Sequence, residues 1–152
     1  PITYGHIDVI KKSLKIFDKL IVATTDNTDK NYSFSVNERL DIINNSLFKD
    51  LKLSKKKIKV ISFDNLTIEL CKRYKANAII RGLRAVSDFE YEFQLAGMNK
   101  KLNSKIETMF LMSDVENQII SSKFVKEIAI LGGNIDRFVT RYTVKMLKNK
   151  FL

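Results

Sequence analysis

Short apolar runs that alternate with longer amphipathic stretches constrain the fold of this chain more than any other feature. Each run is rich in Ile, Val, Leu or Phe and too short for a helix, as is typical of buried parallel strands. The runs are residues 19–25, 58–63, 77–82 and 106–112. The stretches between them repeat apolar residues at spacings of three and four, which predicts amphipathic helices. Strands separated by helices predict an α/β fold with a parallel sheet covered on both faces.

The predicted helices carry start and end signals. A serine followed three residues later by a glutamate forms a capping box and predicts a helix start. The two pairs are Ser35 with Glu38 and Ser87 with Glu90. Gly132 and Gly133 mark the end of a helix that begins near residue 121. The other predicted helices are residues 5–17, residues 66–75, in which Leu66, Leu70 and Tyr74 share one stripe beside Cys71, and residues 140–149.

The predicted order begins with a helix, whereas in a sheet of this kind each helix follows a strand. We therefore expect a Rossmann-like, doubly wound parallel sheet of five strands in the full fold, with the first strand missing from this chain. The length of 152 residues fits a single domain over residues 1–152.

The composition bounds the possible partners. No apolar run approaches the ~20 residues that span a bilayer, and the single cysteine favours a reducing, cytoplasmic setting. The net charge of +10 permits nucleic acid or phosphorylated small molecules as partners. Because 21 of the 27 basic residues are lysines spread along the chain, and the densest cluster (Lys52 to Lys59) is expected in a loop, the charge alone identifies no partner.

Polar residues gather at one edge of the predicted sheet. Ligands of such sheets bind beyond the carboxyl ends of the strands, where the following helices begin. The residues expected there are Gly5 and His6, Lys30, the run Arg81-Gly82-Leu83-Arg84 in a tight loop, and Ser121 with Ser122. Guanidinium forks, an imidazole and free N–H groups at helix starts all bind phosphate oxygens.

Each of these groups also has a structural interpretation when taken alone. A single histidine is often structural, and serines commonly cap helices. The acids Asp88, Glu90 and Glu92 can cap a helix and pair with Arg81 and Arg84. Together at one edge, however, the groups favour phosphoryl or nucleotidyl transfer, in which the protein positions its substrates and neutralises charge. Covalent or general acid–base catalysis fits less well, and no protein metal cage is expected.

Three stretches resemble known signatures. "TYGH" (residues 3–6) resembles the TxGH form of the (H/T)xGH motif of the nucleotidylyltransferase superfamily, and "IISSKFVKE" (residues 119–127) resembles its second signature. "RGLRAVSDFEYEFQLAGMN" (residues 81–99) is similar to a stretch distinctive of the bacterial phosphopantetheine adenylyltransferase family of coenzyme A biosynthesis. The resemblance covers essentially the whole chain in the same order of elements.

The resemblance implies adenylyl transfer from ATP to 4′-phosphopantetheine with Mg²⁺, giving dephospho-coenzyme A and pyrophosphate. It implies that His6 stabilises the transition state, that Lys30 and Arg81 hold the phosphopantetheine phosphate, and that Thr67 lies in the pantetheine groove. The residues implied to contact ATP are His6, Gly82, Leu83, Arg84, Glu92, Asn117, Gln118, Ile119, Ile120, Ser121, Ser122 and Lys123. The family also implies a cytoplasmic homo-hexamer.

The chain departs from the family pattern at three places. The family's first strand and its GxFD loop, which contact both substrates, precede the proline that matches Pro1, so activity is expected of the full-length protein rather than of residues 1–152 alone. Lys123 stands where the family usually has a third Ser or Thr, and Asn117 stands where it commonly has an aromatic residue.

Two alternatives remain open at this stage. One is another nucleotidylyltransferase, such as a nicotinamide mononucleotide adenylyltransferase or a cytidylyltransferase, against which residues 81–99 argue. The other is a basic nucleic-acid-binding domain, although the sequence lacks a recognition motif and its aromatic residues fall mostly at core-like spacings. We therefore expect no nucleic acid and no membrane among the partners.

Overall fold

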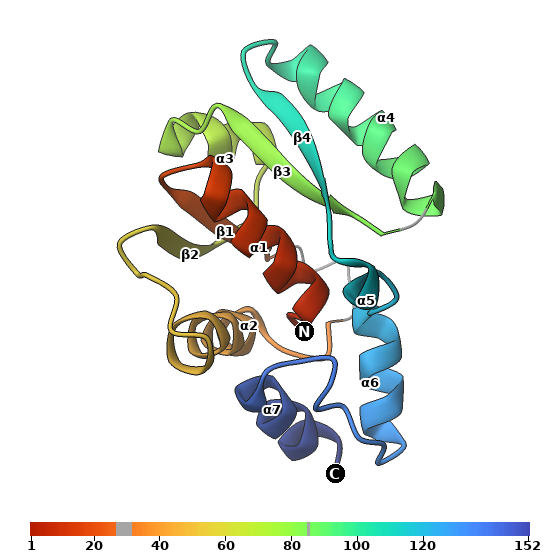
Figure 1. The fold of residues 1–152 in the computed structure, drawn as a ribbon. Coiled ribbons are helices and arrows are strands. Elements are labelled where there is room, and N and C mark those ends of the chain that lie inside the picture. The colour runs from red at the N-terminus through yellow and green to blue at the C-terminus, as the bar shows by residue number, and fades with distance from the viewer. Residues whose placement is uncertain (27–31, 85) are drawn as a thin grey trace.

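A computed structural model describes residues 1–26, 32–84 and 86–152, with only the backbone given for Val86 and Ser87. The elements alternate as the sequence predicts (Figure 1). They are α1 (Tyr4–Ile16), β1 (Leu20–Thr25), α2 (Val36–Asn44), a π-helix η1 (Asn45–Asp50), β2 (Ile58–Phe63), α3 (Thr67–Tyr74), β3 (Ala78–Leu83), α4 (Val86–Leu102), β4 (Glu107–Met112), α5 (Val115–Gln118), α6 (Ser122–Ile130) and α7 (Arg141–Phe151).

The strands are parallel, which confirms the predicted α/β class. β1 pairs with β2 from Leu20↔Ile58 onward, and β3 pairs with β4 from Ala78↔Glu107 onward. Within the described residues these form two separate two-stranded sheets rather than the single sheet expected from the sequence. Helix α1 packs against β1 and also against β3 and β4, so it joins the two pairs.

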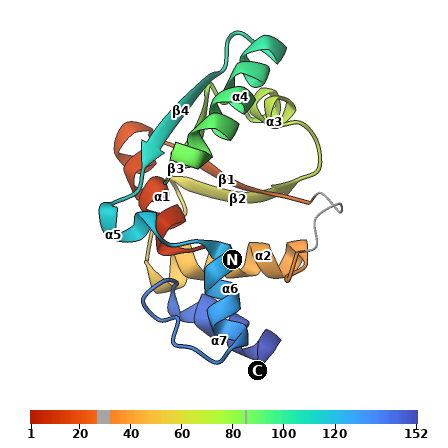
Figure 2. The same cartoon turned by 90° about the vertical axis from the view of Figure 1, so that its right-hand side faces the viewer.

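The helices lie on both sides of the strands. Figure 2 shows α2, α6 and α7 gathered below β1 and β2, with α3 and α4 above them. The start of α1 lies close to the start of α6 in both ribbon views (Figures 1 and 2). No helix in the described part of the chain combines the length and the apolar character that a bilayer crossing needs.

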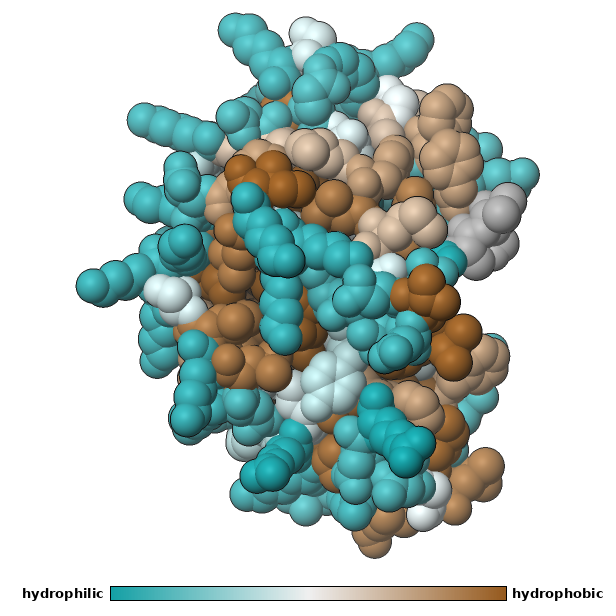
Figure 3. All heavy atoms as spheres, viewed as in Figure 1, coloured by the Kyte–Doolittle hydropathy of each residue, from teal (hydrophilic) through white to brown (hydrophobic). Residues whose placement is uncertain are grey.

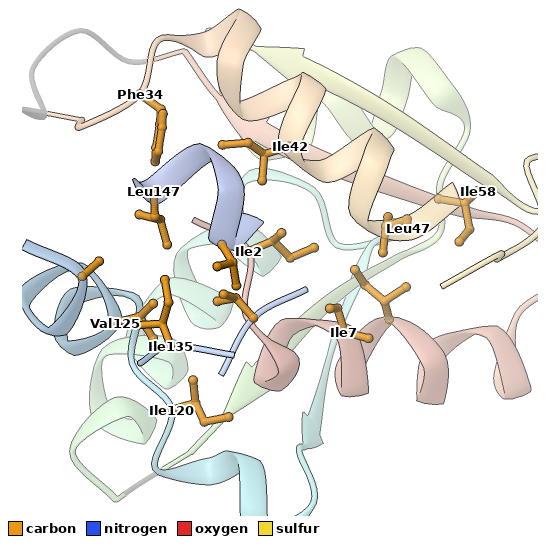
Figure 4. Close-up of a cluster of buried hydrophobic side chains, with 14 residues drawn as sticks. Ile2, Ile7, Phe34, Ile42, Leu47, Ile58, Ile120, Val125, Ile135 and Leu147 are labelled. Carbon is orange, nitrogen blue, oxygen red and sulfur yellow. The ribbon is translucent and has the colours of Figure 1, made fainter. Parts of the chain in front are cut away.

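In the part of the chain that the structure describes, two apolar clusters form the core. The larger brings together α1, α2, η1, α6 and α7, with Ile7, Leu47 and Leu147 at most 1% exposed (Figure 4). The smaller joins α3 to β3 through Ile68, Cys71, Ile79 and Ile106. The larger cluster includes Ile2 and Ile7 around the start of α1 and Ile120 and Val125 around the start of α6, so it packs these two helix starts into one core.

Three local predictions were wrong. Leu66 is 58% exposed, because it precedes the first turn of α3, whereas Leu70 of the same predicted stripe is buried together with Ile68 and Cys71. Strand β3 does not stop at Gly82 but continues to Leu83, because Gly82 still pairs with Leu111 of β4. Helix α4 begins at Val86, one residue before the predicted Ser87 cap.

The other boundaries follow the sequence closely. The Ser35–Glu38 capping box is present: Ser35 N–H donates to Glu38 Oε2 at 2.7 Å, and Glu38 N–H donates to Ser35 Oγ at 3.2 Å. The lysine-rich run from Lys52 is a connection that enters β2 at Ile58, as expected for a solvated loop. The short helix α5 was not predicted.

Candidate active site

The first helix orients His6 through its own N-cap. The Thr3 N–H donates to His6 Nδ1 at 3.2 Å, and Thr3 Oγ1 lies 2.8 Å from the same nitrogen. Thr3 is fully buried, so it is a fixed anchor. Because Nδ1 accepts a hydrogen bond, the proton of the neutral ring belongs on Nε2. His6 is therefore assigned as a donor whose Nε2–H is free to face a ligand.

The surroundings keep His6 uncharged. The pKa of His6 is lowered to about 4, first because packed protein atoms desolvate the ring and then because the N-terminal amino group and Arg84 place positive charges nearby. The residue nevertheless keeps solvent-exposed surface. A neutral, reachable imidazole can donate one hydrogen bond to an anionic oxygen at neutral pH.

Gly5 allows the start of α1 to approach the segment before α6. A Cβ at this buried position would lie 3.2 Å from the Asn117 carbonyl oxygen and 3.6 Å from Thr3 Oγ1. Any larger side chain would push the two segments apart. Packing therefore requires the glycine of the TYGH motif (residues 3–6), in addition to any close approach of a ligand to this backbone.

Arg84 joins three elements at this place. Its Nε donates to Asp88 Oδ2 of α4 at 3.1 Å, and its Nη1 donates to the Ile120 carbonyl at 3.4 Å. Because the Arg84 side chain is 42% exposed, part of its guanidinium remains available to a ligand. The structure thus confirms that Arg84 lies near the residues before α6, as the sheet-edge argument predicted.

Arg81 does not lie in a loop, contrary to the prediction, but within β3 opposite Phe110 of β4. Its Nε and Nη2 donate to the two Glu92 oxygens, each at 2.7 Å. The carboxylate raises the pKa of Arg81 above its ordinary value. Gly82 follows, and a Cβ there would meet Val9 Cγ2 of α1 at 3.0 Å, so this strand runs tightly against the first helix.

The second signature starts α6. Ser121 is the N-cap and accepts from the Lys123 N–H at 3.2 Å, while Ser122 Oγ donates to the Pro1 carbonyl at 2.8 Å. Ile120 is buried, whereas Ile119 and Lys123 are exposed. In this state both hydroxyls are used within the chain, and the N-terminal N–H groups of α6 supply the positive end of the helix dipole.

The predicted residues are only partly brought together. His6, Arg84, Ile120, Ser121 and Ser122 meet where α1 and α6 begin, and we call this group the α1–α6 site. Gln118 donates from Nε2 to the Ser113 carbonyl at 3.1 Å. Thr67 begins α3, and the described hydrogen bonds do not connect it to the α1–α6 site. Lys30 lies outside the described residues.

Two residues that lie near the site, Arg39 and Asp8, were not identified from the sequence. Arg39 of α2 donates through Nη1 to Thr24 Oγ1 at 3.0 Å and to the Thr25 carbonyl at 2.7 Å, so it holds the carboxyl end of β1. Asp8 of α1 accepts hydrogen bonds from the segment that leads into α6. A local spacing rule identifies neither contact, because both partners come from other elements.

The α1–α6 site combines two helix starts, an uncharged hydrogen-bond donor and a guanidinium. These groups bind phosphate oxygens and stabilise negative charge that develops on them. The described groups that line the site include no cysteine thiol, and its serine hydroxyls are hydrogen-bonded within the chain. The arrangement therefore suits transfer between two phosphorylated substrates by positioning and charge stabilisation.

Comparison with known proteins agrees with this chemistry. Residues 1–128 match the cytidylyltransferase-like family. A phosphopantetheine adenylyltransferase of Pelagibacter ubique is 66% identical over 151 residues, covering 99% of this chain and 92% of its own length. The proteins of the same name in Rhizorhabdus wittichii and Zymomonas mobilis are 47% and 45% identical, covering 95% and 97% of this chain and 85% and 83% of their own lengths.

The fold, the site and these matches define the chain as a nucleotidyltransferase of the cytidylyltransferase-like family. Within that class, it belongs to the phosphopantetheine adenylyltransferase family.

Proposed function

We propose that this chain transfers the adenylyl group of ATP to 4′-phosphopantetheine. A phosphate oxygen of phosphopantetheine attacks the α-phosphorus, and the bond from that phosphorus to the α–β bridging oxygen breaks. The products are dephospho-coenzyme A and pyrophosphate. The names of three relatives at 45–66% identity support this substrate pair.

The orientation of His6 is the structural observation that carries the proposal. Its Nδ1 is held by Thr3, so Nε2–H is the ring group that remains to donate to a phosphate bound at the starts of α1 and α6. A preorganised donor contributes most where charge develops in the transition state. We assign His6 to the oxygens of the transferred α-phosphate and of the departing pyrophosphate.

The remaining roles follow the same division of the site. Arg84, with Gly82, Leu83 and Glu92, is assigned to ATP, and the segment from Asn117 to Lys123 closes on the nucleotide. Arg81 and Lys30 are assigned to the phosphate of phosphopantetheine, and Thr67 to the pantetheine groove. Because Arg81 is paired with Glu92 in this structure, phosphate binding would exchange one anionic partner of the guanidinium for another.

Transfer from ATP generally involves a divalent metal, and we propose Mg²⁺. Among the described residues there is no group of three or more His, Cys, Asp or Glu side chains that would hold a metal ion. Mg²⁺ commonly keeps several water ligands and is bound largely by substrate phosphates. We therefore assign its ligands to ATP and water, and its contribution is neutralisation of phosphate charge.

The proposal extends to the assembly and setting of the protein. We infer that residues 1–152 form one nucleotidylyltransferase domain that acts in the cytoplasm as a homo-hexamer. The apolar residues exposed on α4, among them Phe89 and Phe93, whose rings pack together, support self-association because monomers rarely expose large contiguous apolar patches.

The test is turnover by the full-length protein. We expect dephospho-coenzyme A and pyrophosphate to accumulate in equal amounts from ATP, Mg²⁺ and 4′-phosphopantetheine, measured by mass spectrometry and a coupled phosphate assay. Replacing ATP by CTP, or phosphopantetheine by nicotinamide mononucleotide, is expected to abolish product. Turnover with nicotinamide mononucleotide but not with phosphopantetheine would overturn the proposal in favour of another acceptor.

A further inference from the structure

One face of α1 carries a set of contacts that the chemistry above does not use. Gly5, Asp8 and Lys12 recur at spacings of three and four, so they share a face of the helix. All three contact the segment of residues 112–117, which leads from β4 toward α6. The segment lies about one hundred residues away in sequence, so only the fold brings the two together.

Asp8 makes the central contact of this face. The Asp114 N–H donates to Asp8 Oδ2 at 3.2 Å, and Asn117 Nδ2 donates to the same oxygen at 2.6 Å. Asp8 and Asn117 are both half-buried. Hydrogen bonds to a partly desolvated carboxylate are among the stronger ones in proteins, so this single oxygen fixes both ends of the first turn of α5.

Lys12 adds a second, more exposed contact. Its Nζ donates to the Met112 carbonyl at 2.7 Å and lies 2.8 Å from Asp114 Oδ1. The Asp114 side chain is 67% exposed. Exposed ion pairs contribute little, so the Asp8 contact is the principal restraint and the Lys12 contact is a minor one.

Among the described residues, the other contacts that hold the segment are the burial of Ser113 and the hydrogen bond from Gln118 to the Ser113 carbonyl. Helix α5 has four residues, far fewer than an independent helix needs in water. Val115 is 78% exposed and Ile119 is 80% exposed, so neither anchors the segment in the core. Its position before the buried Ile120 therefore depends on the polar contacts with α1.

We propose that Asp8 is a positioning residue for nucleotide binding. By fixing the turn from Asp114 to Asn117 on α1, Asp8 places the Ile120 carbonyl, which contacts Arg84, and the start of α6 against His6. Asp8 itself touches no substrate in this scheme. The inference rests on the proposed function, because the segment from Asn117 to Lys123 is the part assigned to close on ATP.

The contact geometry suggests two informative variants of the full-length protein. Asp8→Ala removes the acceptor, and Asp8→Asn keeps one: a side-chain amide oxygen placed at the Oδ2 position can accept both hydrogen bonds without the charge. Asp18→Ala is the matched control, because Asp18 is an exposed aspartate just beyond the other end of the same helix.

We expect Asp8→Ala to raise KM for ATP about tenfold while KM for 4′-phosphopantetheine changes by less than about twofold. We expect Asp8→Asn to remain within about threefold of the wild type, and Asp18→Ala to be indistinguishable from it. Equal losses toward both substrates, or no effect of Asp8→Ala on KM for ATP, would overturn the assignment. A purely structural role would change both Michaelis constants together and lower the melting temperature.

Hydrogen exchange separates this inference from the proposed function. In the substrate-free protein, Asp8→Ala is expected to accelerate amide exchange over residues 114–121 by at least tenfold, with little change in the core strands β1 and β2. If the wild type fails to make dephospho-coenzyme A, the proposed function fails, but the exchange result still decides whether Asp8 holds the segment. Unchanged exchange over residues 114–121 would refute the positioning role by itself.

Discussion

Two groups of candidate residues are held by different kinds of interaction. The α1 side comprises Thr3, His6 and Asp8, and the α4 side comprises Arg81 and Arg84 with their partners on α4. On the α1 side, Thr3 holds His6 within the start of the same helix, and Asp8 accepts a hydrogen bond from Asn117 of α5. On the α4 side, full ion pairs neutralise the two arginines, and the helix exposes aromatic side chains. The α1 side is therefore preorganised for a ligand. On the α4 side, the arginines have to exchange their carboxylate partners for phosphate when a ligand binds, and the exposed aromatic side chains have to be covered when the protein assembles.

The largest effect on catalysis is expected from removal of the preorganised donor, His6. We expect His6→Ala to lower kcat by about 10²–10³, the usual cost of losing one donor that acts in the transition state. KM values are expected to change much less, because ground-state binding uses other groups. Steady-state kinetics of the full-length protein measure this, and a kcat within about fivefold of the wild type would remove His6 from the mechanism.

The α4 side is tested at the ion pair between Arg81, which is partly exposed, and Glu92, which is largely buried. Arg81→Ala is expected to raise KM for 4′-phosphopantetheine by about 10–10², since a guanidinium bonded to phosphate is worth one or two charge-assisted hydrogen bonds. The change also strands the Glu92 carboxylate, whose side chain is only 11% exposed, so stability falls as well.

The double variant Arg81→Ala/Glu92→Gln separates the two consequences. Replacing the stranded carboxylate by an amide is expected to restore most of the melting temperature while KM for 4′-phosphopantetheine stays high. If the double variant also recovers KM, Arg81 acts by holding Glu92 rather than by binding phosphate.

Local signals in the sequence accounted for most of the elements and for part of the site. Strands such as β2 and caps such as Ser35 are set by neighbouring residues, and the sheet-edge rule placed His6 near Arg84. The pairing of Asp8 with Asn117 depends on a contact between residues 109 positions apart, which no local pattern encodes. The extension of β3 through Gly82 likewise depends on the strand beside it.

The error on α3 has a related origin. Leu66 and Leu70 have helical spacing, but Leu66 precedes the first turn and is exposed, whereas Leu70 is buried. The smaller apolar cluster, which includes Ile79 and Ile106, takes Ile68 and Cys71 from the helix. Periodicity alone therefore identified neither the residue at which the helix begins nor the full set of residues that face the core.

The exposed face of α4 offers a test of assembly with a smaller expected effect. Apolar side chains gather over α4 and β4 in the upper right of Figure 3. Phe89 packs on Phe93 and Phe110 with ring centroids 5.7 and 6.1 Å apart, yet Phe93 remains 62% exposed. We expect Phe93→Glu to weaken self-association at least tenfold, measured by sedimentation equilibrium.

The matched control is Phe124→Glu on α6, because Phe124 is 58% exposed but lies on a different helix. It introduces the same charge and removes a side chain of the same size. If Phe124→Glu dissociates the protein and Phe93→Glu does not, the interface lies on α6 rather than on α4.

The titration of His6 tests whether the α1 side is preorganised in the free protein. Since the sequence has one histidine, a single imidazole signal reports it in NMR spectra. We expect this signal to titrate with a pKa of about 4, well below its unfolded value, and to show the Nε2–H tautomer between pH 6 and 8.

The low pKa also predicts the sign of a stability change. The unfolded chain takes up a proton at His6 near pH 6.5, whereas the folded chain does so only near pH 4, so the unfolded state binds more protons between these values. The free energy of unfolding therefore receives its full contribution above pH 6.5 and loses it as the pH falls toward 4. His6→Asn should flatten this part of the urea-unfolding profile, and an imidazole that titrates near 6.5 in the folded protein would show that burial and the nearby positive charges do not keep the ring neutral.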